Sequence, residues 1–294
     1  MNNEEKIKTL INEANSLNLS SLIPSLEKVL QENAFVVQSF YDTKPKLDIG
    51  EVYQETLLIK IIFTSRSILE LSKGIEFGIL NRKERPLIID RSSLYILTRS
   101  VIESFLTLEY LYFNNLSREE QIFRYNLWRI SGFMARQDFG KTKNEKFLSK
   151  MEREKAEINE LKKTIKTSPY YSKLKQQQLW KLDKYGLPRI MSWSELLKQS
   201  ILKTDLFEKV YKLYSNYAHS EFIAMIQLNE GKMSKSDSFN AETTVTTLNN
   251  IRVINCVSII SFKNKYEFAK DKYMEIEESS RYVIEFWNKF GIEE

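Results

Sequence analysis

Apolar side chains recur every three or four residues along almost the whole chain, which is the spacing that lines one face of an α-helix. A clear example is the run Val245, Leu248, Ile251, Ile254 and Val257. The breaks between such runs are short and polar, and the 294 residues include only 8 glycines and 5 prolines. A large antiparallel sheet would need many more tight turns. The sequence therefore predicts an all-α fold.

Breaks and shifts in composition divide this helical chain into three parts. We expect an N-terminal helical pair over residues 1–45, because the Thr43-Lys44-Pro45 break stops the second helix. Residues 46–140 and 190–294 should together form a helical core. Between them, residues 141–189 have a narrow apolar stripe on a charged background, which is typical of a protruding basic helical hairpin.

Helix starts are marked by residues that can cap the first turn. Asp90 is a typical N-cap, and Ser117 with Glu120 and Ser192 with Glu195 have the spacing of capping boxes. The longer expected helices run from about Asn3 to Asn15, Ser21 to Tyr41, Glu51 to Leu80, Asp90 to Phe113, Ser117 to Phe139, Asp205 to Leu228, Ala241 to Phe262 and Lys265 to Phe290.

Several classes of protein are disfavoured by the composition. Cys256 is the only cysteine, so the chain contains neither an internal disulfide nor a thiolate zinc cluster. Its first ten residues lack the basic and apolar halves of a signal peptide, and apolar stretches such as Val253 to Phe262 are short for a membrane span. No phosphate-cradling glycine motif is present. We therefore expect a cytoplasmic protein that has no membrane partner and no cofactor.

The only histidine, His219, lies in the sequence Tyr214-Ser-Asn-Tyr-Ala-His-Ser-Glu221. Imidazole exchanges a proton near neutral pH, so His219 is a candidate general base or acid. In a continuous helix from Asp205 to Leu228, its neighbours on one face would be Lys212, Ser215, Phe222 and Ile226. A core histidine hydrogen-bonded to a neighbouring helix is the alternative interpretation.

A charge pair lies in the strongly apolar helix that begins at Asp90. Arg99 and Glu103 are four residues apart and so share a helix face. A buried charge must be paired or used, because an unpaired one is very costly. Either the pair is a polar clamp between helices, or Arg99 binds phosphate while Glu103 orients Arg99 or His219.

The segment from Leu161 to Arg189 is strongly basic. It contains eight Lys or Arg residues against Asp183 alone, a net charge of +7, and also four aromatic rings. The rings belong to Tyr170, Tyr171, Trp180 and Tyr185. Cations interleaved with stacking rings are typical of a single-stranded RNA path, with Lys162, Lys163, Lys173 and Lys175 as candidate contacts. The alternative is a solvated helical arm.

The elements Arg99-Ser-x-x-Glu103 and Tyr214-Ser-x-Tyr-Ala-His219-Ser, in this order on two helices, resemble a bacterial all-helical family of uncharacterised function placed near the HEPN superfamily. The resemblance covers roughly Glu51 to Leu228. HEPN domains are helical bundles that often dimerise, and many are metal-independent ribonucleases of toxin, antiphage or RNA-processing systems. The resemblance thus implies a HEPN-like bundle, a homodimer and a protein partner in a defence system.

The activity implied is ribonucleolytic transesterification without a metal ion. His219 would take the 2′-hydroxyl proton, and Arg99, helped by Lys212, would stabilise the charge on the phosphorane. The phosphate or the imidazole tautomer would be held by Tyr214, Ser215 and Asn216.

This chain departs from the usual HEPN motif, in which four to six residues separate an arginine from a histidine on the same helix. Here Lys212 is the only cation in register, so Arg99 would have to supply the charge. The alternative is a catalytically inactive module that binds a nucleotide or a protein partner, with His219 and Arg99 as polar links between helices.

Overall fold

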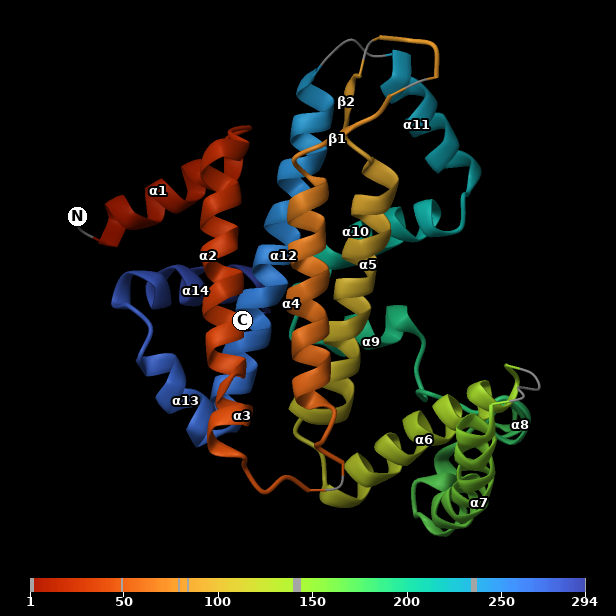
Figure 1. Ribbon diagram of the computed structural model, residues 1–294. Coiled ribbons are helices and arrows are strands. Elements are labelled where there is room, and N and C mark those ends of the chain that lie inside the picture. Colours follow the sequence, from red (N-terminus) through yellow and green to blue (C-terminus); the bar gives the residue numbers. More distant parts are fainter. Residues whose placement is uncertain are drawn as a thin grey trace. The chain divides into compact units, whose positions relative to one another are not determined.

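Helices account for most of the chain in the computed structural model, which describes residues 3–48, 50–78, 80–83, 85–139, 144–233 and 237–293 (Figure 1). The predicted all-α fold is confirmed, with a two-stranded hairpin as the exception among these residues. The chain divides into two compact units. Unit 1 consists of Met1–Lys46, Val52–Leu108 and Leu197–Glu294, and unit 2 consists of Leu47–Glu51 and Glu109–Leu196.

Four long helices lie side by side in unit 1: α2 (Leu19–Val37), α4 (Gln54–Leu71), α5 (Arg91–Leu108) and α12 (Asp237–Lys265) (Figure 1). Helix α12 contacts the other three, because its apolar residues are buried on more than one side of the helix. Among the described residues it is also the one helix long and apolar enough to cross a membrane, by length and composition, over Asn240–Lys265. Its most apolar window is 78% buried inside the protein, so the core accounts for this composition.

Shorter helices complete unit 1. They are α1 (Asn3–Asn15), α3 (Ser39–Thr43), α10 (Thr204–Ala218), α11 (Phe222–Met233), α13 (Glu267–Met274) and α14 (Glu278–Gly291), while α9 (Trp193–Gln199) spans the boundary between the units. Helix α10 packs across α5, and α14 packs on α12 (Figure 1). The expected helix from Lys265 to Phe290 is thus two helices, α13 and α14.

The expected helix from Glu51 to Leu80 ends early, because α4 stops at Leu71. The chain turns at Gly74, whose φ is +87°, into strands β1 (Ile75–Glu76) and β2 (Leu87–Ile88), which pair antiparallel with Ile75 opposite Ile88. A Cβ atom on residue 74 would lie 2.7 Å from Cγ of Leu87. Only glycine accommodates both the backbone angle and this approach.

The helix starts agree with the capping residues. The Asp90 side chain accepts a hydrogen bond from the Ser93 N–H at 3.1 Å, and Ser117 Oγ accepts one from the Glu120 N–H at 3.2 Å. Ser192 and Glu195 form both bonds of a capping box, at 3.2 and 2.7 Å. These bonds satisfy N–H groups that the first helical turn leaves without a partner.

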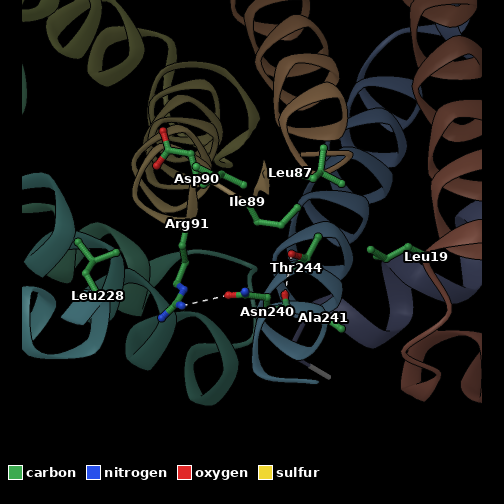
Figure 2. A pocket seen from close by; sticks show the side chains of 10 residues that line it. Leu19, Leu87, Ile89, Asp90, Arg91, Leu228, Asn240, Ala241 and Thr244 are labelled. Atoms are coloured by element: carbon green, nitrogen blue, oxygen red, sulfur yellow. Dashed lines mark hydrogen bonds between the residues drawn. The ribbon is translucent and has the colours of Figure 1, made fainter. Parts of the chain in front are cut away.

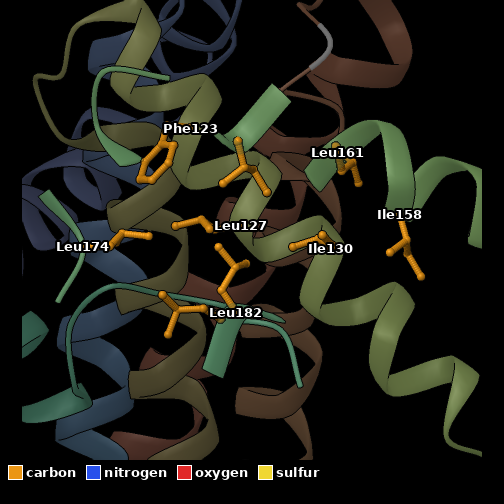
Figure 3. Packing of buried hydrophobic residues seen from close by; sticks show 9 residues of the cluster. Phe123, Leu127, Ile130, Ile158, Leu161, Leu174 and Leu182 are labelled. Atoms are coloured by element: carbon orange, nitrogen blue, oxygen red, sulfur yellow. The ribbon is translucent and has the colours of Figure 1, made fainter. Parts of the chain in front are cut away.

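Unit 2 contains a π-helical turn η1 (Glu109–Phe113), α6 (Arg118–Gln137), α7 (Glu145–Thr167), a 3₁₀ turn η2 (Tyr171–Lys173) and α8 (Gln176–Lys184). Its core is a cluster of buried side chains from α6, α7, α8 and the segments flanking α8 (Figure 3). Leu127 and Ile130 of α6 belong to this cluster together with Ile158 and Ile165 of α7.

The segment expected to protrude as a hairpin from residue 141 therefore shares a hydrophobic core with α6 (Figure 3). The unit boundary lies at Glu109, some thirty residues before the expected one, while residues 140–143 lie outside the described part of the chain. The N-terminal pair expected over residues 1–45 also falls within a larger unit, because α2 packs on α4 and α12.

Candidate functional site

Helix α5 presents Arg99 and Glu103 on one face in unit 1, where α10 packs across it. Arg99 Nε donates a hydrogen bond to Glu103 Oε1 at 2.9 Å, and the two side chains are 17% and 25% exposed. The pair is therefore shielded but still reachable from solvent. Such a partly desolvated pair interacts more strongly than a surface pair does.

His219 lies at the carboxyl end of α10 and not in the middle of a helix, which corrects the expectation of one helix from Asp205 to Leu228. Ser220 has a φ of +53°, its N–H donates to the Tyr217 carbonyl at 3.3 Å, and the Glu221 N–H donates to the Asn216 carbonyl at 2.9 Å. These two bonds form a Schellman motif, which ends a helix by turning the next residue into the left-handed region. His219 is exposed as a result, which excludes the interpretation of a core histidine.

Arg99 connects the two helices at this site. Its Nη1 lies 3.2 Å from His219 Nε2, while its Nε holds Glu103. A guanidinium only donates hydrogen bonds, so Nε2 must be the acceptor, and a neutral ring then carries its proton on Nδ1. The structure thus brings Arg99, Glu103 and His219 together through the arginine.

Tyr211 is a member of the site that the sequence reasoning missed. Its hydroxyl donates to the same oxygen, Oε1 of Glu103, at 2.8 Å, and its ring centroid lies 5.3 Å from Cζ of Arg99. Burial, together with the Glu103 carboxylate, raises the pKa of Tyr211 to about 12, so the phenol stays protonated at neutral pH. The spacing of Tyr211, Ser215 and His219, four residues each, was the available signal.

The other residues expected around His219 have different surroundings. Lys212 is exposed on α10, and within the described part of the chain no hydrogen bond joins it to Arg99, Glu103 or His219. Ser215 Oγ donates to the Tyr211 carbonyl at 2.8 Å, and the Asn216 carbonyl accepts the bond that closes the turn. Ser215 and Asn216 therefore support the backbone beneath His219.

Tyr214 lies in the core of unit 1, which corrects the expectation that it contacts phosphate. It is 1% exposed, its hydroxyl accepts from Asn250 Nδ2 at 3.1 Å, and its ring centroid is 4.5 Å from that of Tyr95. Burial raises its pKa to about 12. Its position on the helix face opposite to solvent explains both properties.

The lysines expected to contact RNA lie in unit 2, on different elements. Lys162 Nζ donates to the Asp183 carbonyl at 3.4 Å, and Lys163 forms an exposed ion pair with Glu160 at 2.8 Å. Lys173 Nζ lies 4.4 Å from the Tyr170 ring centroid, and Lys175 is exposed just before α8. The charges of this group are therefore spread over α7, η2 and the start of α8.

A more concentrated arrangement of cation and rings lies at the end of α8. Trp180 and Tyr185 are 53% and 51% exposed, and their ring centroids are 5.6 Å apart. Lys184 Nζ lies 5.1 Å from the first ring and 5.0 Å from the second. Exposed rings beside a lysine offer both stacking and charge to an unpaired base.

Among the described residues, no three His, Cys, Asp or Glu side chains gather as the ligands of a metal ion would. The candidate site in unit 1 instead consists of one imidazole, one guanidinium, one carboxylate and one phenol. This set can bind an anion and exchange a proton.

Comparison with known proteins gives one match. The sequence pattern of a family described as "Family of unknown function (DUF5677)" matches residues 56–237, a range that contains Arg99, Glu103, Tyr211 and His219 as well as all of α6, α7 and α8. No curated protein and no solved structure matches the chain.

Proposed function

The chain belongs to DUF5677, a family of unknown function, and we propose that it is a HEPN-like, metal-independent ribonuclease whose active site is formed by His219, Arg99 and Glu103. The observation that carries the proposal is the 3.2 Å contact between Arg99 Nη1 and the exposed His219 Nε2. A base and a phosphate-binding cation at this separation can act on neighbouring atoms of one phosphodiester.

In the proposed reaction, Nε2 of His219 takes the proton of a ribose 2′-hydroxyl. The 2′-oxygen then forms a bond to phosphorus, and the bond from phosphorus to the 5′-oxygen of the next nucleotide breaks. That 5′-oxygen takes the proton back from the imidazolium, and a 2′,3′-cyclic phosphate remains.

Arg99 has two tasks in this scheme. Its Nη1 leaves Nε2 when the substrate enters and donates to the phosphorane oxygens, whose charge it stabilises. Its Nε stays on Glu103, which also accepts from Tyr211, so the guanidinium keeps its orientation while Nη1 changes partner. Glu103 and Tyr211 are positioning residues, and exposed Lys212 is a second cation available to the substrate.

The exposed rings and lysines of unit 2 support RNA as the substrate. Trp180, Tyr185 and Lys184 would hold an unpaired base, and the surrounding lysines would contact phosphates. We place the protein in the cytoplasm on the grounds of its composition, and in an antiphage defence or toxin setting with a partner protein, as its resemblance to HEPN proteins implies.

The second candidate is a catalytically inactive module that binds a nucleotide or a protein. The contact between Arg99 and His219 favours it as well, because it links α5 to α10 without any substrate. In this case replacing His219 would lower the stability of unit 1 and would remove no activity.

The two functions are distinguished by His219→Gln, with Lys209→Gln as a matched control on an exposed position of the same helix. We expect His219→Gln to lower cleavage of a single-stranded RNA by about 100-fold or more, with the free energy of unfolding changed by less than about 0.5 kcal/mol. Lys209→Gln should retain the wild-type rate of cleavage and the wild-type free energy of unfolding. The assay contains EDTA, and the product should carry a cyclic phosphate.

Three results would contradict the ribonuclease. These are unchanged cleavage by His219→Gln, loss of wild-type cleavage in EDTA, and cleavage of a matched DNA strand that has no 2′-hydroxyl. A large fall in stability with no activity to lose would support the inactive module.

We also propose that the protein is a homodimer. The resemblance implies it, and exposed apolar side chains next to His219 support it: Phe222 is 79%, Ile223 45% and Met225 41% exposed. A run of this kind is typical of a surface that another protein covers. Light scattering should give the mass of two chains, and Phe222→Ser should shift the mass towards one chain. A wild-type monomer at micromolar concentration would contradict the dimer.

A further inference from the structure

The β-hairpin between α4 and α5 exposes large apolar side chains at one end of these two helices in unit 1 (Figure 1). Its strands β1 and β2 are two residues long, and beyond their last pair the Phe77 N–H donates to the Pro86 carbonyl at 3.1 Å. Five apolar residues of the hairpin are between 42% and 89% exposed: Ile75, Phe77, Leu80, Leu87 and Ile88. Apolar side chains exposed together in this way are typical of a surface that binds a partner.

The rest of unit 1 leaves strand β2 partly uncovered, because the strand borders a cavity of about 710 Å³ (Figure 2). Leu87 and Ile88 line this cavity together with Leu19 of α2, and they remain 64% and 43% exposed. Asp90 and Arg91 also contribute to the wall, so the cavity itself is polar in part. The apolar surface that a partner would cover is therefore the hairpin.

Cations lie beside the apolar side chains at the tip of the hairpin. Asn81 has a φ of +65°, which turns the chain into Arg82 and Lys83, and both of these side chains are exposed. Arg85 is exposed as well, and no acidic side chain among the described residues forms an ion pair with any of the three. Residues 80–85 contain these three cations and one glutamate, which gives the tip a net charge of +2.

We propose that this hairpin binds the surface of an anionic lipid membrane. Its apolar side chains would enter the boundary between headgroups and acyl chains, while the cations beside them would contact lipid phosphates. The cytoplasmic leaflet carries anionic lipids, which fits a tip of charge +2. The expectation of no membrane partner rested on apolar stretches too short to span a bilayer, and a hairpin that binds at the surface needs no span. The inference does not depend on ribonuclease activity.

Two features of the hairpin favour lipid over RNA and over a second protein. Of its five exposed apolar side chains, four are aliphatic, and Phe77 alone has a ring on which a base could stack. A stable protein interface takes roughly 20–30 residues from each side. The hairpin, from Ile75 to Ile88, is smaller than this. A lipid surface has no such requirement, because each inserted side chain contributes by itself.

The test is flotation of the full chain with two kinds of vesicle. One contains phosphatidylcholine and phosphatidylglycerol in equal parts, and the other contains phosphatidylcholine alone. We expect binding to the mixed vesicles to be at least about tenfold tighter than to the neutral ones. Lys83→Gln should weaken binding to the mixed vesicles by about fivefold. Lys60→Gln, which changes an exposed lysine of α4, is the matched control and should bind as the wild type does.

The apolar part of the site is tested by Phe77→Ser, which should weaken binding to the mixed vesicles by about tenfold. Phe63→Ser, at a position on α4 that is 67% exposed, is its control and should bind as the wild type does. A fluorescent label measures insertion directly. Cys256 is buried, so Leu80→Cys provides the one thiol that an environment-sensitive dye can reach. Its emission should shift to the blue on mixed vesicles, and the same label on Phe63→Cys should not shift.

Several results would overturn the proposal. These are lack of wild-type binding to mixed vesicles, equal affinity for the two kinds of vesicle, equal losses by Phe77→Ser and Phe63→Ser, and an unshifted label at position 80. A change in mass from two chains to one in Phe77→Ser, with vesicle binding unaltered, would also overturn it. That result would assign the hairpin to a contact between two copies of the chain.

Discussion

One carboxylate oxygen, Oε1 of Glu103, accepts hydrogen bonds from Arg99 on its own helix and from Tyr211 on α10. The phenol keeps its proton because burial, and after it the neighbouring Glu103 carboxylate, raise the pKa of Tyr211. Loss of this proton at alkaline pH would leave two negative charges side by side, on Tyr211 and Glu103. Their repulsion would oppose the packing of α10 on α5.

We expect the free energy of unfolding to fall between about pH 10 and pH 12. The pKa values of Tyr211 and Tyr214 rise to about 12 on folding, so the folded state holds protons that the unfolded state releases near pH 10. Their contribution is therefore complete below pH 10 and is lost as the pH rises towards 12. Denaturant unfolding at pH 9 and pH 11.5 measures the change.

Tyr211→Phe should reduce this alkaline loss by on the order of 1 kcal/mol, after allowance for solvent screening. Tyr41→Phe, which replaces a tyrosine that is 68% exposed, is the control and should leave the loss as it is. If Tyr211→Phe and Tyr41→Phe lose the same free energy of unfolding at alkaline pH, the raised pKa of Tyr211 does not contribute to the loss.

At this scale the sequence predicted the pairing of Arg99 with Glu103 and marked His219 as the one histidine of the chain, but it did not predict that His219 lies at the end of α10. Helical spacing fixes the first, and composition alone marks the second. Tyr211 and Tyr214 could not be told apart in the same way, because the chain has 15 tyrosines and only the packing of α10 decides which of them face Glu103 and which face the core.

At the scale of elements, starts were easier to predict than ends. Asp90, Ser117 and Ser192 begin helices because their side chains accept from the first free N–H groups, and this signal is local. The end of α10 has no such mark: the left-handed position of its Schellman motif is Ser220, where glycine is the usual residue. The turn that exposes His219 was missed for this reason.

At Gly186 in unit 2, the segment that follows α8 lies very close to α6. It follows α8 with a φ of +81°, and a Cβ atom there would lie 2.5 Å from Cα of Ser131 on α6. We expect Gly186→Ala to lower the free energy of unfolding by roughly 2 kcal/mol or more, because it adds backbone strain to a clash. Thermal unfolding measures the effect.

The matched control is Gly132→Ala, which changes the residue directly after Ser131 on α6. Apart from the backbone of its own helix, a Cβ atom on residue 132 would meet no atom of the described residues within 4 Å. This variant should raise stability by about 1 kcal/mol through helix propensity. Similar effects of the two variants would contradict the close approach of residue 186 to α6.

At the scale of the whole molecule, RNA affinity should depend on salt through the lysines of unit 2. Each neutralised phosphate of a single strand contributes a slope of about −0.7 to the log–log plot of affinity against salt. Replacing Lys162, Lys163, Lys173 and Lys175 together by Gln should flatten this slope. Lys60→Gln, an exposed lysine of unit 1, should leave it unchanged.

Trp180→Ala is a second variant to measure in the same RNA-binding experiment. Loss of stacking should weaken RNA binding by about 1–3 kcal/mol without changing the slope, because no charge is removed. Filter binding at several salt concentrations separates the two effects. Unchanged binding by both variants would mean that these residues of unit 2 form a solvated surface that does not bind RNA.

The division into units was the part of the architecture that the sequence predicted least well. The apolar residues of α6 recur with the helical period, but that period cannot state whether they contact α5, α12 or α7. In the structure, Leu127 and Ile130 of α6 share a buried cluster with Ile158 and Ile165 of α7. Helix α6 therefore belongs to the same unit as the segment from residue 141, which was expected to protrude alone.

The central place of α12 has a consequence for synthesis. The partners of this helix, α2, α4 and α5, leave the ribosome long before residues 237–265 do, so unit 1 cannot close while they are being made. Unit 2 is nearly continuous in sequence and is complete by Leu196. The nascent chain therefore carries all of unit 2 between two incomplete parts of unit 1, whose apolar faces stay uncovered until α12 has been made.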